Sequence, residues 1–202
     1  MKKQILLILA ALVMFQLQAQ KIKLTSGDVK VLQGEEFVDI SFTYDDDLKI
    51  GKLSEDQYIS KKMAEAEEEE PGSGEKWKEM WYEDRMVHFE PKFIELINKY
   101  VEEKNVVIRP DINGAKYKMI VNTVFLEPGF NVGVARKSAS IDLEVTIVAV
   151  GNESESLATI MIYGSPGSSF SYGDYDVGVR VGEAYAKAGK ELGKFLLKNK
   201  AF

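Results

Sequence analysis

The residues best suited to catalysis lie between Trp77 and Glu90, where acidic and aromatic side chains are interspersed. Glu83, Asp84 and Glu90 follow Trp77 and Trp81 closely. Two carboxyl groups can hydrolyse a glycoside, and aromatic rings can stack on the sugar. The spacing does not separate these acids from solvated acids on a surface helix whose tryptophans fill the core. A carboxylate-dependent glycan hydrolase is therefore an alternative prediction, behind a non-enzymatic one.

Other catalytic classes lack the residues that they need. The chain has no cysteine and a single histidine, His88. A cysteine nucleophile and a zinc site with two histidines are thereby excluded. A serine triad would have to use His88, and no Gly-x-Ser-x-Gly turn, Walker loop or dinucleotide fingerprint occurs. We expect no catalytic residue, no metal site and no cofactor.

An aromatic-rich stretch is the more informative candidate. Residues 164–176 combine glycine and serine with Phe170, Tyr172 and Tyr175. Thirteen residues without a periodic pattern are long for a connection in a compact domain. Aromatic rings on a pliable backbone suit a contact loop, although the rings could instead fold back over the core. We predict that this loop binds a partner.

Trp77 and Trp81 form a second predicted contact surface, because residues four apart share one face of a helix. They belong to a helical insertion at about 54–103. Ser54 and Gln57 fit a capping box at its start. Pro91 marks a break after Glu90 and the start of another helix.

The predicted sheet has to position these helices and loops. Residues 138–150 alternate apolar and polar side chains, as on a strand with one buried face. Residues 157–163 return after a turn, and 37–44 form the first core strand, which ends at three aspartates. Residues 117–126 are apolar on both faces, which predicts either a strand covered on both sides or a bulge that switches faces.

The C-terminal helix, about residues 177–198, is the predicted cover of the sheet. Its apolar residues recur at spacings of three and four: Val177, Val181, Tyr185, Ala188, Leu192 and Phe195. It also holds four glycines, Gly178, Gly182, Gly189 and Gly193, which predict close approach of its backbone to the sheet. We therefore predict an α+β two-layer sandwich, with a mostly antiparallel sheet, helices packed on one face and this helix covering it.

The N-terminus predicts export. A positive start and an apolar run from Ile5 to Phe15 are typical of a signal peptide over residues 1–19, cleaved before Gln20. The alternative is an uncleaved anchor helix, but the apolar run is shorter than the roughly 20 residues that a spanning helix needs. The remaining 20–202 suits a single α+β domain without a transmembrane span. No cysteine follows the apolar run, so we expect the protein not to be lipidated. We expect a periplasmic or outer-membrane-associated location.

Charge narrows the class of partner. After cleavage, 24 basic and 32 acidic side chains leave a net charge of −8. This argues against nucleic-acid binding and against binding to anionic membranes. An envelope or cell-surface protein is the expected partner, and a homo-oligomer is compatible with the glycine-rich final helix.

Element order also supports a resemblance. The four segments 117–126, 138–150, 157–164 and 177–198, with Gly182-Glu183-Ala184-Tyr185, resemble the C-terminal part of periplasmic domains of the CsgG, LpoB and TolB N-terminal kind. The stretch from Leu48 through Trp77, Trp81, Arg85, Glu90, Pro91 and Phe93 resembles uncharacterised exported proteins of Gram-negative envelopes. The resemblance implies a mixed sheet flanked by helices and a scaffolding or partner-binding role. It implies no catalytic residue, and this chain lacks the lipidated cysteine of the lipoprotein members.

The leading prediction is thus an exported, non-enzymatic partner-binding or scaffolding protein. The alternatives are the glycan hydrolase and a small-ligand carrier. A cleft with two carboxyl groups roughly 5–10 Å apart would favour the enzyme. Exposed aromatic residues on an open surface would favour the binding module, and a closed apolar pocket would favour the carrier.

Overall fold

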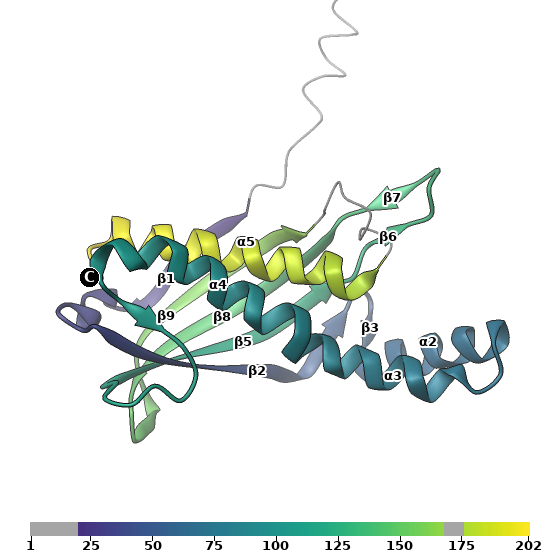
Figure 1. Cartoon of the computed structure of the whole chain (residues 1–202), viewed down its shortest axis with the longest axis horizontal. Helices are drawn as coiled ribbons and strands as arrows, with labels where there is room; N and C mark the ends of the chain where they lie inside the picture. Colours follow the sequence, from purple (N-terminus) through teal and green to yellow (C-terminus); the bar gives the residue numbers. More distant parts are fainter. Residues whose placement is uncertain (1–19, 168–175) are drawn as a thin grey trace, which may run out of the picture.

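A mixed sheet with helices on one face forms the protein (Figure 1). The structure is a computed structural model that describes residues 20–167 and 176–202. The main sheet contains β1 (Lys21–Gly27), β2 (Phe37–Ile50), β3 (Leu53–Ser54), β4 (Val107–Ile108), β5 (Tyr117–Glu127), β8 (Ala139–Ala149) and β9 (Asn152–Gly167). A separate hairpin consists of β6 (Phe130–Asn131) and β7 (Arg136–Lys137).

Most of the helices lie between β3 and β4. They are α2 (Glu55–Glu69), α3 (Ser73–Asp84), the π-helical turn η2 (Arg85–Phe89), α4 (Glu90–Val101) and the short η3 (Glu102–Lys104). The described residues also contain η1 (Val29–Leu32), which follows β1, and the long α5 (Val177–Lys198). The predicted capping box at the start of α2 is present, with Ser54 accepting from the Gln57 N–H.

The sheet is mostly antiparallel, as predicted. Its order is β1-β9-β8-β5-β2-β3, and β4 pairs with β2 beyond this path. Among the strands that the structure describes, β2 alone makes parallel pairs, with β5 and with β4. Parallel neighbours require a long crossover connection, and the run of helices from α2 to α4 supplies it.

A bulge in β5 explains its apolar residues on both faces. Met119, Val121 and Thr123 are buried with period two, the register shifts between Thr123 and Phe125, and Leu126 is then buried instead. Of the two predicted alternatives for this segment, the bulge that switches faces is the correct one.

The prediction that the three aspartates end the first strand is wrong. The strand β2 continues through them to Ile50. Its pairing with β5 is interrupted between Tyr44 and Lys49, so Asp45 to Asp47 occupy a bulge outside the ladder. A bulge leaves residues unpaired without ending the strand, and an alternation pattern does not reveal it.

The predicted break at Pro91 is also wrong, although Pro91 does lie in the first turn of α4, as predicted for the start of a helix. Helix α3 runs through η2 into α4, and the Glu90 N–H binds the Arg85 carbonyl with π-helical spacing. Proline has no N–H to continue the α-helical ladder, and the wider turn just before it keeps the helix continuous.

The long helix α5 covers the sheet, but its glycines do not face the sheet as predicted. They face the end of α3, η2 and α4, which form one continuous helical run beside α5 (Figure 1). A Cβ at Gly189 would overlap the Phe93 carbonyl, and one at Gly178 would overlap the Asp84 carboxylate. The larger apolar residues of α5 pack on the sheet instead. The glycines therefore set the spacing between α5 and the helical run beside it.

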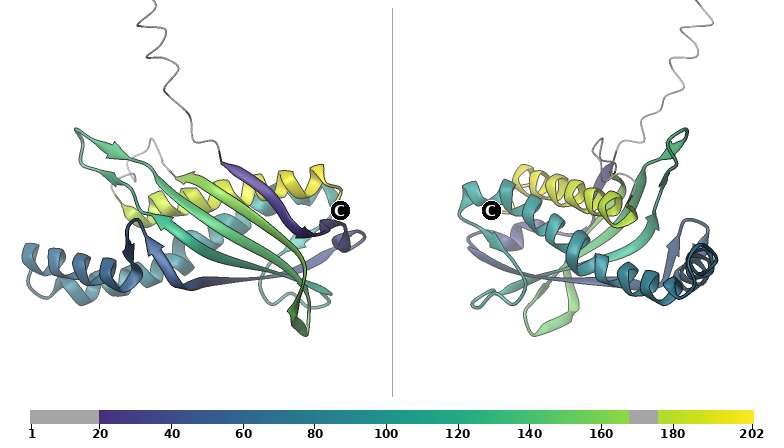
Figure 2. Two further views of the ribbon diagram at one scale, coloured as in Figure 1. Left: turned by 180° about the vertical axis from the view of Figure 1, so that it is seen from behind. Right: turned by 45° about the vertical axis from the view of Figure 1, so that its right-hand side comes forward.

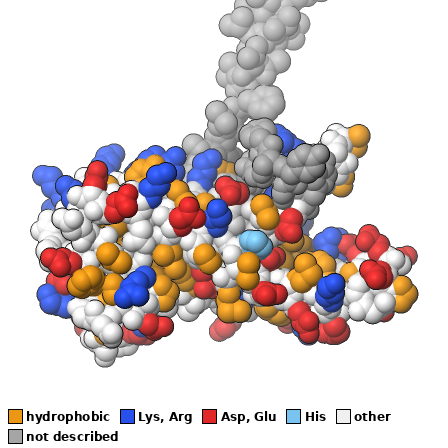
Figure 3. Space-filling view, viewed as in Figure 1, with side chains coloured by type: hydrophobic (Ala, Val, Ile, Leu, Met, Phe, Trp, Pro, Cys, Tyr) orange, Lys and Arg blue, Asp and Glu red, His pale blue; other side chains and the backbone are white. Residues whose placement is uncertain are grey.

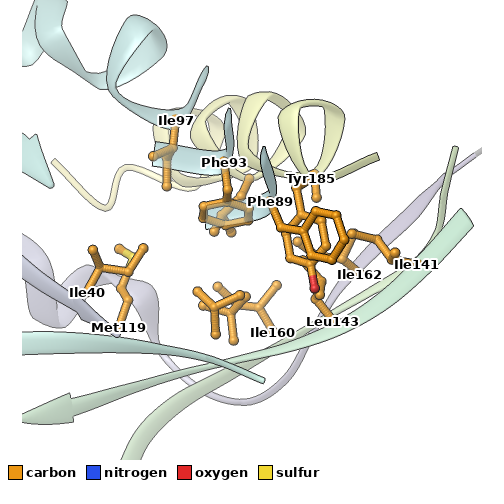
Figure 4. Packing of buried hydrophobic residues seen from close by; sticks show 14 of the residues in the cluster. Ile40, Phe89, Phe93, Ile97, Met119, Ile141, Leu143, Ile160, Ile162 and Tyr185 are labelled. Carbon is orange, nitrogen blue, oxygen red and sulfur yellow. The ribbon is translucent and has the colours of Figure 1, made fainter. Parts of the chain in front are cut away.

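The core lies between the sheet and the α4–α5 pair (Figure 4). Phe89 from η2 stacks on Tyr185 from α5, with ring centroids 5.1 Å apart. Phe93 meets Phe42 edge to face at 5.6 Å. Aliphatic residues of the central strands fill the floor, among them Met119, Ile141, Leu143, Ile160 and Ile162.

The α2–α3 helical hairpin extends beyond the end of the sheet (Figure 1). Residues 55–84 hold eleven acidic and four basic side chains, a net charge of −7. The rest of the described domain is therefore close to neutral, and acidic side chains gather over α2 and α3 (Figure 3).

Candidate binding pocket

A cavity of about 360 Å³ lies where the α2–α3 hairpin, the β6 strand and the start of α5 meet. Its size is at the lower end of the range for small-molecule sites. Charged and aromatic side chains both line it: Tyr58, Lys62, Trp77, Met80, Trp81, Asp84, Gly129, Phe130, Asn131, Asp176, Val177 and Arg180.

Three rings from α2 and α3 form an aromatic wall. Trp77 stacks on Trp81 with centroids 5.7 Å apart and ring planes 13° from parallel. Tyr58 contacts both, at 5.9 Å and 5.0 Å. Trp81 is only 3% exposed, whereas Trp77 is half-buried and exposed Met80 lies beside it. Trp77 is therefore the ring of the predicted pair that a partner can reach.

A single carboxylate holds the wall in place. Glu55, at the start of α2, accepts a 2.7 Å hydrogen bond from the Trp81 indole N–H. The same carboxylate accepts bonds of 2.6 Å and 2.8 Å from Arg85 in η2. Arg85 also lies over the Tyr44 ring, 3.8 Å from its centroid. The wall is thus tied to the sheet, and Trp77 has a fixed support.

Arg180 brings a buried cation to the opposite side of the pocket. It lies one turn into α5, and its Nε donates to the Pro128 carbonyl at 3.3 Å. This bond links α5 to the connection between β5 and β6. Burial raises the pKa of the Tyr58 hydroxyl to about 12, and the nearby Arg180 opposes this shift.

Two carboxylates, those of Asp84 and Asp176, lie beside the start of α5. Asp176 caps α5 by accepting from the Val179 N–H at 3.2 Å. Asp84 lies against Gly178, and its Oδ1 is 3.7 Å from His88 Nε2. Burial raises the pKa of Asp84 to about 6; His88 lowers it and Asp176 raises it. The desolvation of the carboxylate outweighs the attraction of the imidazole.

A second polar group lies deeper, between the sheet and η2. The Tyr44 hydroxyl donates to Glu90 Oε1 at 3.3 Å, and the Tyr185 and Thr123 hydroxyls share a 2.5 Å bond. Burial raises the pKa values of Tyr44, Tyr185 and Glu90. These groups do not line the pocket. They satisfy one another within the core, as buried polar groups must.

The structure describes only some of the residues that were predicted to contact a partner. Trp77 and Trp81 lie together in the pocket wall. Phe170, Tyr172 and Tyr175 lie outside the described residues. The predicted irregular stretch begins too early, because Gly164 to Gly167 belong to β9, and Ser165 to Gly167 pair with β8. Gly167 can pass closely under α5 because it has no side chain; a Cβ there would overlap the Arg180 carbonyl.

Of the acids predicted for chemistry, only Asp84 lines the pocket. Glu83 is exposed beside it, and Glu90 belongs to the buried group at Tyr44. His88 is half-buried at the rim near Asp84. Among the described residues, no three His, Asp or Glu side chains converge as a metal site requires.

Sequence reasoning missed Tyr58, Phe130, Asp176 and Arg180 as pocket residues. Arg180 had a detectable signal, because it interrupts a run of valines and glycines in the first turns of α5. The others had none, since their meeting depends on how α2, β6 and α5 are placed in space.

Within residues 20–167 and 176–202, no helix is both long enough and apolar enough to span a membrane. No protein-family model matches the chain, and no curated protein sequence matches it.

Some solved structures are distantly similar to this chain, at low identity. Two PelC dodecamers from Paraburkholderia phytofirmans, one of them a point variant, are 10% and 11% identical, each with a TM-score of 0.38. They cover 83% of this chain and 95% and 96% of theirs. A DUF330 protein from Xanthomonas campestris is 16% identical, with a TM-score of 0.33 over 52% of this chain and 58% of its own. Similarity at this level does not assign the chain to a family.

Proposed function

We propose that the protein is an exported, non-enzymatic binding module of the cell envelope, periplasmic or outer-membrane-associated and not lipidated. Its partner is an envelope or cell-surface protein that places a side chain against Trp77. The observation that carries this proposal is the supported aromatic wall of the pocket. Trp77 is accessible, yet its position is set by Trp81, Tyr58 and the Glu55–Arg85 pair.

Preorganisation is what makes such a ring useful for binding. An aromatic side chain that is already ordered loses little freedom when a partner covers it. Tryptophan, tyrosine and arginine dominate the energetics of protein interfaces, and they act best in partly enclosed pockets with less important contacts around them. Trp77 stands in such a pocket, with Met80 and Phe130 exposed beside it.

The charge around the pocket indicates the chemistry of the partner. The α2–α3 hairpin has a net charge of −7, so it attracts basic surfaces and repels acidic ones. A partner segment that combines an apolar or aromatic anchor with lysine or arginine would match both features. The Phe170, Tyr172 and Tyr175 stretch remains a proposed second contact, because it directly precedes Asp176 in the pocket wall.

Site-specific photo-crosslinking tests this function. A photoreactive residue at Met80, on the pocket rim, should capture a discrete envelope protein in the producing cell. The same probe at exposed Val150, in the β8–β9 turn, is the control. Adding Trp77→Ala should abolish capture from position 80 in a protein that still unfolds cooperatively. Equal capture from both positions, or capture indifferent to Trp77, would contradict the proposal.

One observation favours hydrolysis as a second function. Asp84 and Asp176 line the same aromatic pocket, and a carboxyl group with a pKa of about 6 is suited to act as a general acid. Against this, the Asp176 carboxylate already caps α5. Turnover of chromogenic glycosides by the wild-type chain, lost in Asp84→Asn, would establish the enzyme. Under the binding proposal, neither protein hydrolyses them.

A carrier for small apolar ligands is the weakest of the three functions. Such a site requires an enclosed apolar cavity. Here Lys62, Asp84, Asp176 and Arg180 all contribute to the wall. Burying an apolar ligand there would cost the solvation of these groups.

A further inference from the structure

The β6–β7 hairpin presents an apolar tip to solvent. Val134 is 99% exposed, Val132 is 65% exposed and Phe130 is 45% exposed. The hairpin stands away from the main sheet at one end of the molecule (Figure 2). Single exposed apolar residues are common on protein surfaces, but three within five residues on one protrusion form a local patch.

The hairpin is a preformed protrusion. The Val132 N–H donates to the Ala135 carbonyl at 3.0 Å, and Asn131 Oδ1 accepts from the Gly133 N–H at 3.0 Å. Gly133 supplies the positive φ of 80° that the turn needs. At the base, Lys137 pairs with Glu127 at 2.6 Å. The two valines are therefore held outward.

The shape and residue types of the tip favour a lipid surface over a protein. A convex tip of small aliphatic side chains makes a poor protein anchor, since valine is under-represented among the residues that dominate interfaces. A bilayer accepts such a tip at the boundary between headgroups and acyl chains.

We propose that the β6–β7 tip inserts reversibly into the surface of a lipid bilayer, with Val132 and Val134 as the inserting side chains. The attraction comes from apolar area more than from charge. Lys137 is neutralised by Glu127, and the acidic α2–α3 hairpin opposes approach to anionic lipid. Binding is therefore expected on zwitterionic vesicles and insensitive to salt.

Vesicle flotation with the chain from Gln20 to Phe202 tests the proposal. Phosphatidylcholine vesicles should carry the wild-type protein, with equal bound fractions at 0.1 M and about 0.5 M salt. Val132→Ser with Val134→Ser should lower the partition coefficient roughly tenfold, the effect of about two buried methylene groups. Circular dichroism and the thermal midpoint establish that the variant is folded.

A matched variant controls for the loss of two exposed valines. Val87 and Val150 are 52% and 49% exposed and lie outside the hairpin, so replacing both with serine should leave flotation unchanged. Three results would overturn the proposal. They are no flotation of the wild type, flotation that requires anionic lipid and disappears in salt, and equal flotation of the tip variant. Self-association lost in the tip variant without flotation would make the tip a protein contact.

Discussion

Individual residues decide how closely α5 can lie against α4. At Gly189, an added methyl group would meet the backbone oxygen of Phe93, so the helices would have to move apart. At Gly182 the nearest atom, the His88 carbonyl oxygen, would be 3.0 Å away, which requires a smaller adjustment. The glycine positions of α5 therefore differ in how well they tolerate an added methyl group.

We predict that Gly189→Ala lowers the free energy of unfolding by about 1–3 kcal/mol, because overpacking outweighs the gain in helix propensity. Gly182→Ala should cost clearly less. Urea denaturation monitored by circular dichroism measures both. Equal stability of the two variants would show that the helices are not in close contact.

The Glu55 carboxylate carries a separate prediction. Glu55→Ala removes the carboxylate that accepts hydrogen bonds from both Trp81 and Arg85. Because these two donors are mostly buried, their loss of an acceptor should lower the free energy of unfolding by about 1–3 kcal/mol. The matched control is Glu65→Ala, which breaks an exposed pair with Lys62 and should cost about 0.5 kcal/mol or less. Chemical denaturation compares them, and similar losses would contradict a supporting role for Glu55.

At the scale of elements, Asp84 joins the end of α3 to the start of α5. Its pKa is about 6 in the folded protein against an ordinary 3.8, so folding favours the protonated form. This stability is fully present below about pH 4 and is lost as the pH rises through about 6. An asparagine at position 84 does not titrate, so the Asp84→Asn variant does not lose this stability as the pH rises.

The thermal midpoint of Asp84→Asn minus that of the wild type should therefore increase between pH 4 and pH 7. Differential scanning calorimetry across this range measures the difference. Glu90, whose pKa burial also raises, titrates in both proteins and cancels. A difference that stays flat, or that falls with rising pH, would show that Asp84 is not held in a desolvated place.

The elements themselves were largely predictable, because their signals are local. Alternation identified the central strands, and periodicity identified α5 as the cover of the sheet. The capping box located the start of α2. Errors arose where tertiary contacts override a local signal: the bulge that carries Asp45 to Asp47 through β2, and the π-turn that carries the helix past Pro91.

The pocket was predictable only in part. Trp77 and Trp81 share a helix face by spacing alone, and this was sufficient to select them. Their neighbours Tyr58, Phe130 and Arg180 come from elements that meet only through the topology of the fold. The glycines of α5 indicated a close approach correctly, but not which neighbour approaches.

At the scale of the whole molecule, the core, the acidic hairpin and the pocket lie in different places. The helices and the sheet provide a core, the acidic α2–α3 hairpin projects from it, and the pocket forms where this hairpin meets β6 and α5. The apolar β6–β7 tip adjoins the pocket through Phe130. A partner bound at Trp77 and a lipid surface at the tip would therefore contact the same end of the protein.

The most direct test of this account is the affinity of the partner captured by crosslinking for the purified chain, measured by isothermal titration calorimetry. We predict that Trp77→Ala weakens binding by about tenfold or more, as truncation of a central aromatic anchor does, while Val150→Ser leaves the dissociation constant unchanged. A dissociation constant for Trp77→Ala within twofold of the wild type, in a folded variant, would contradict the pocket as the binding site.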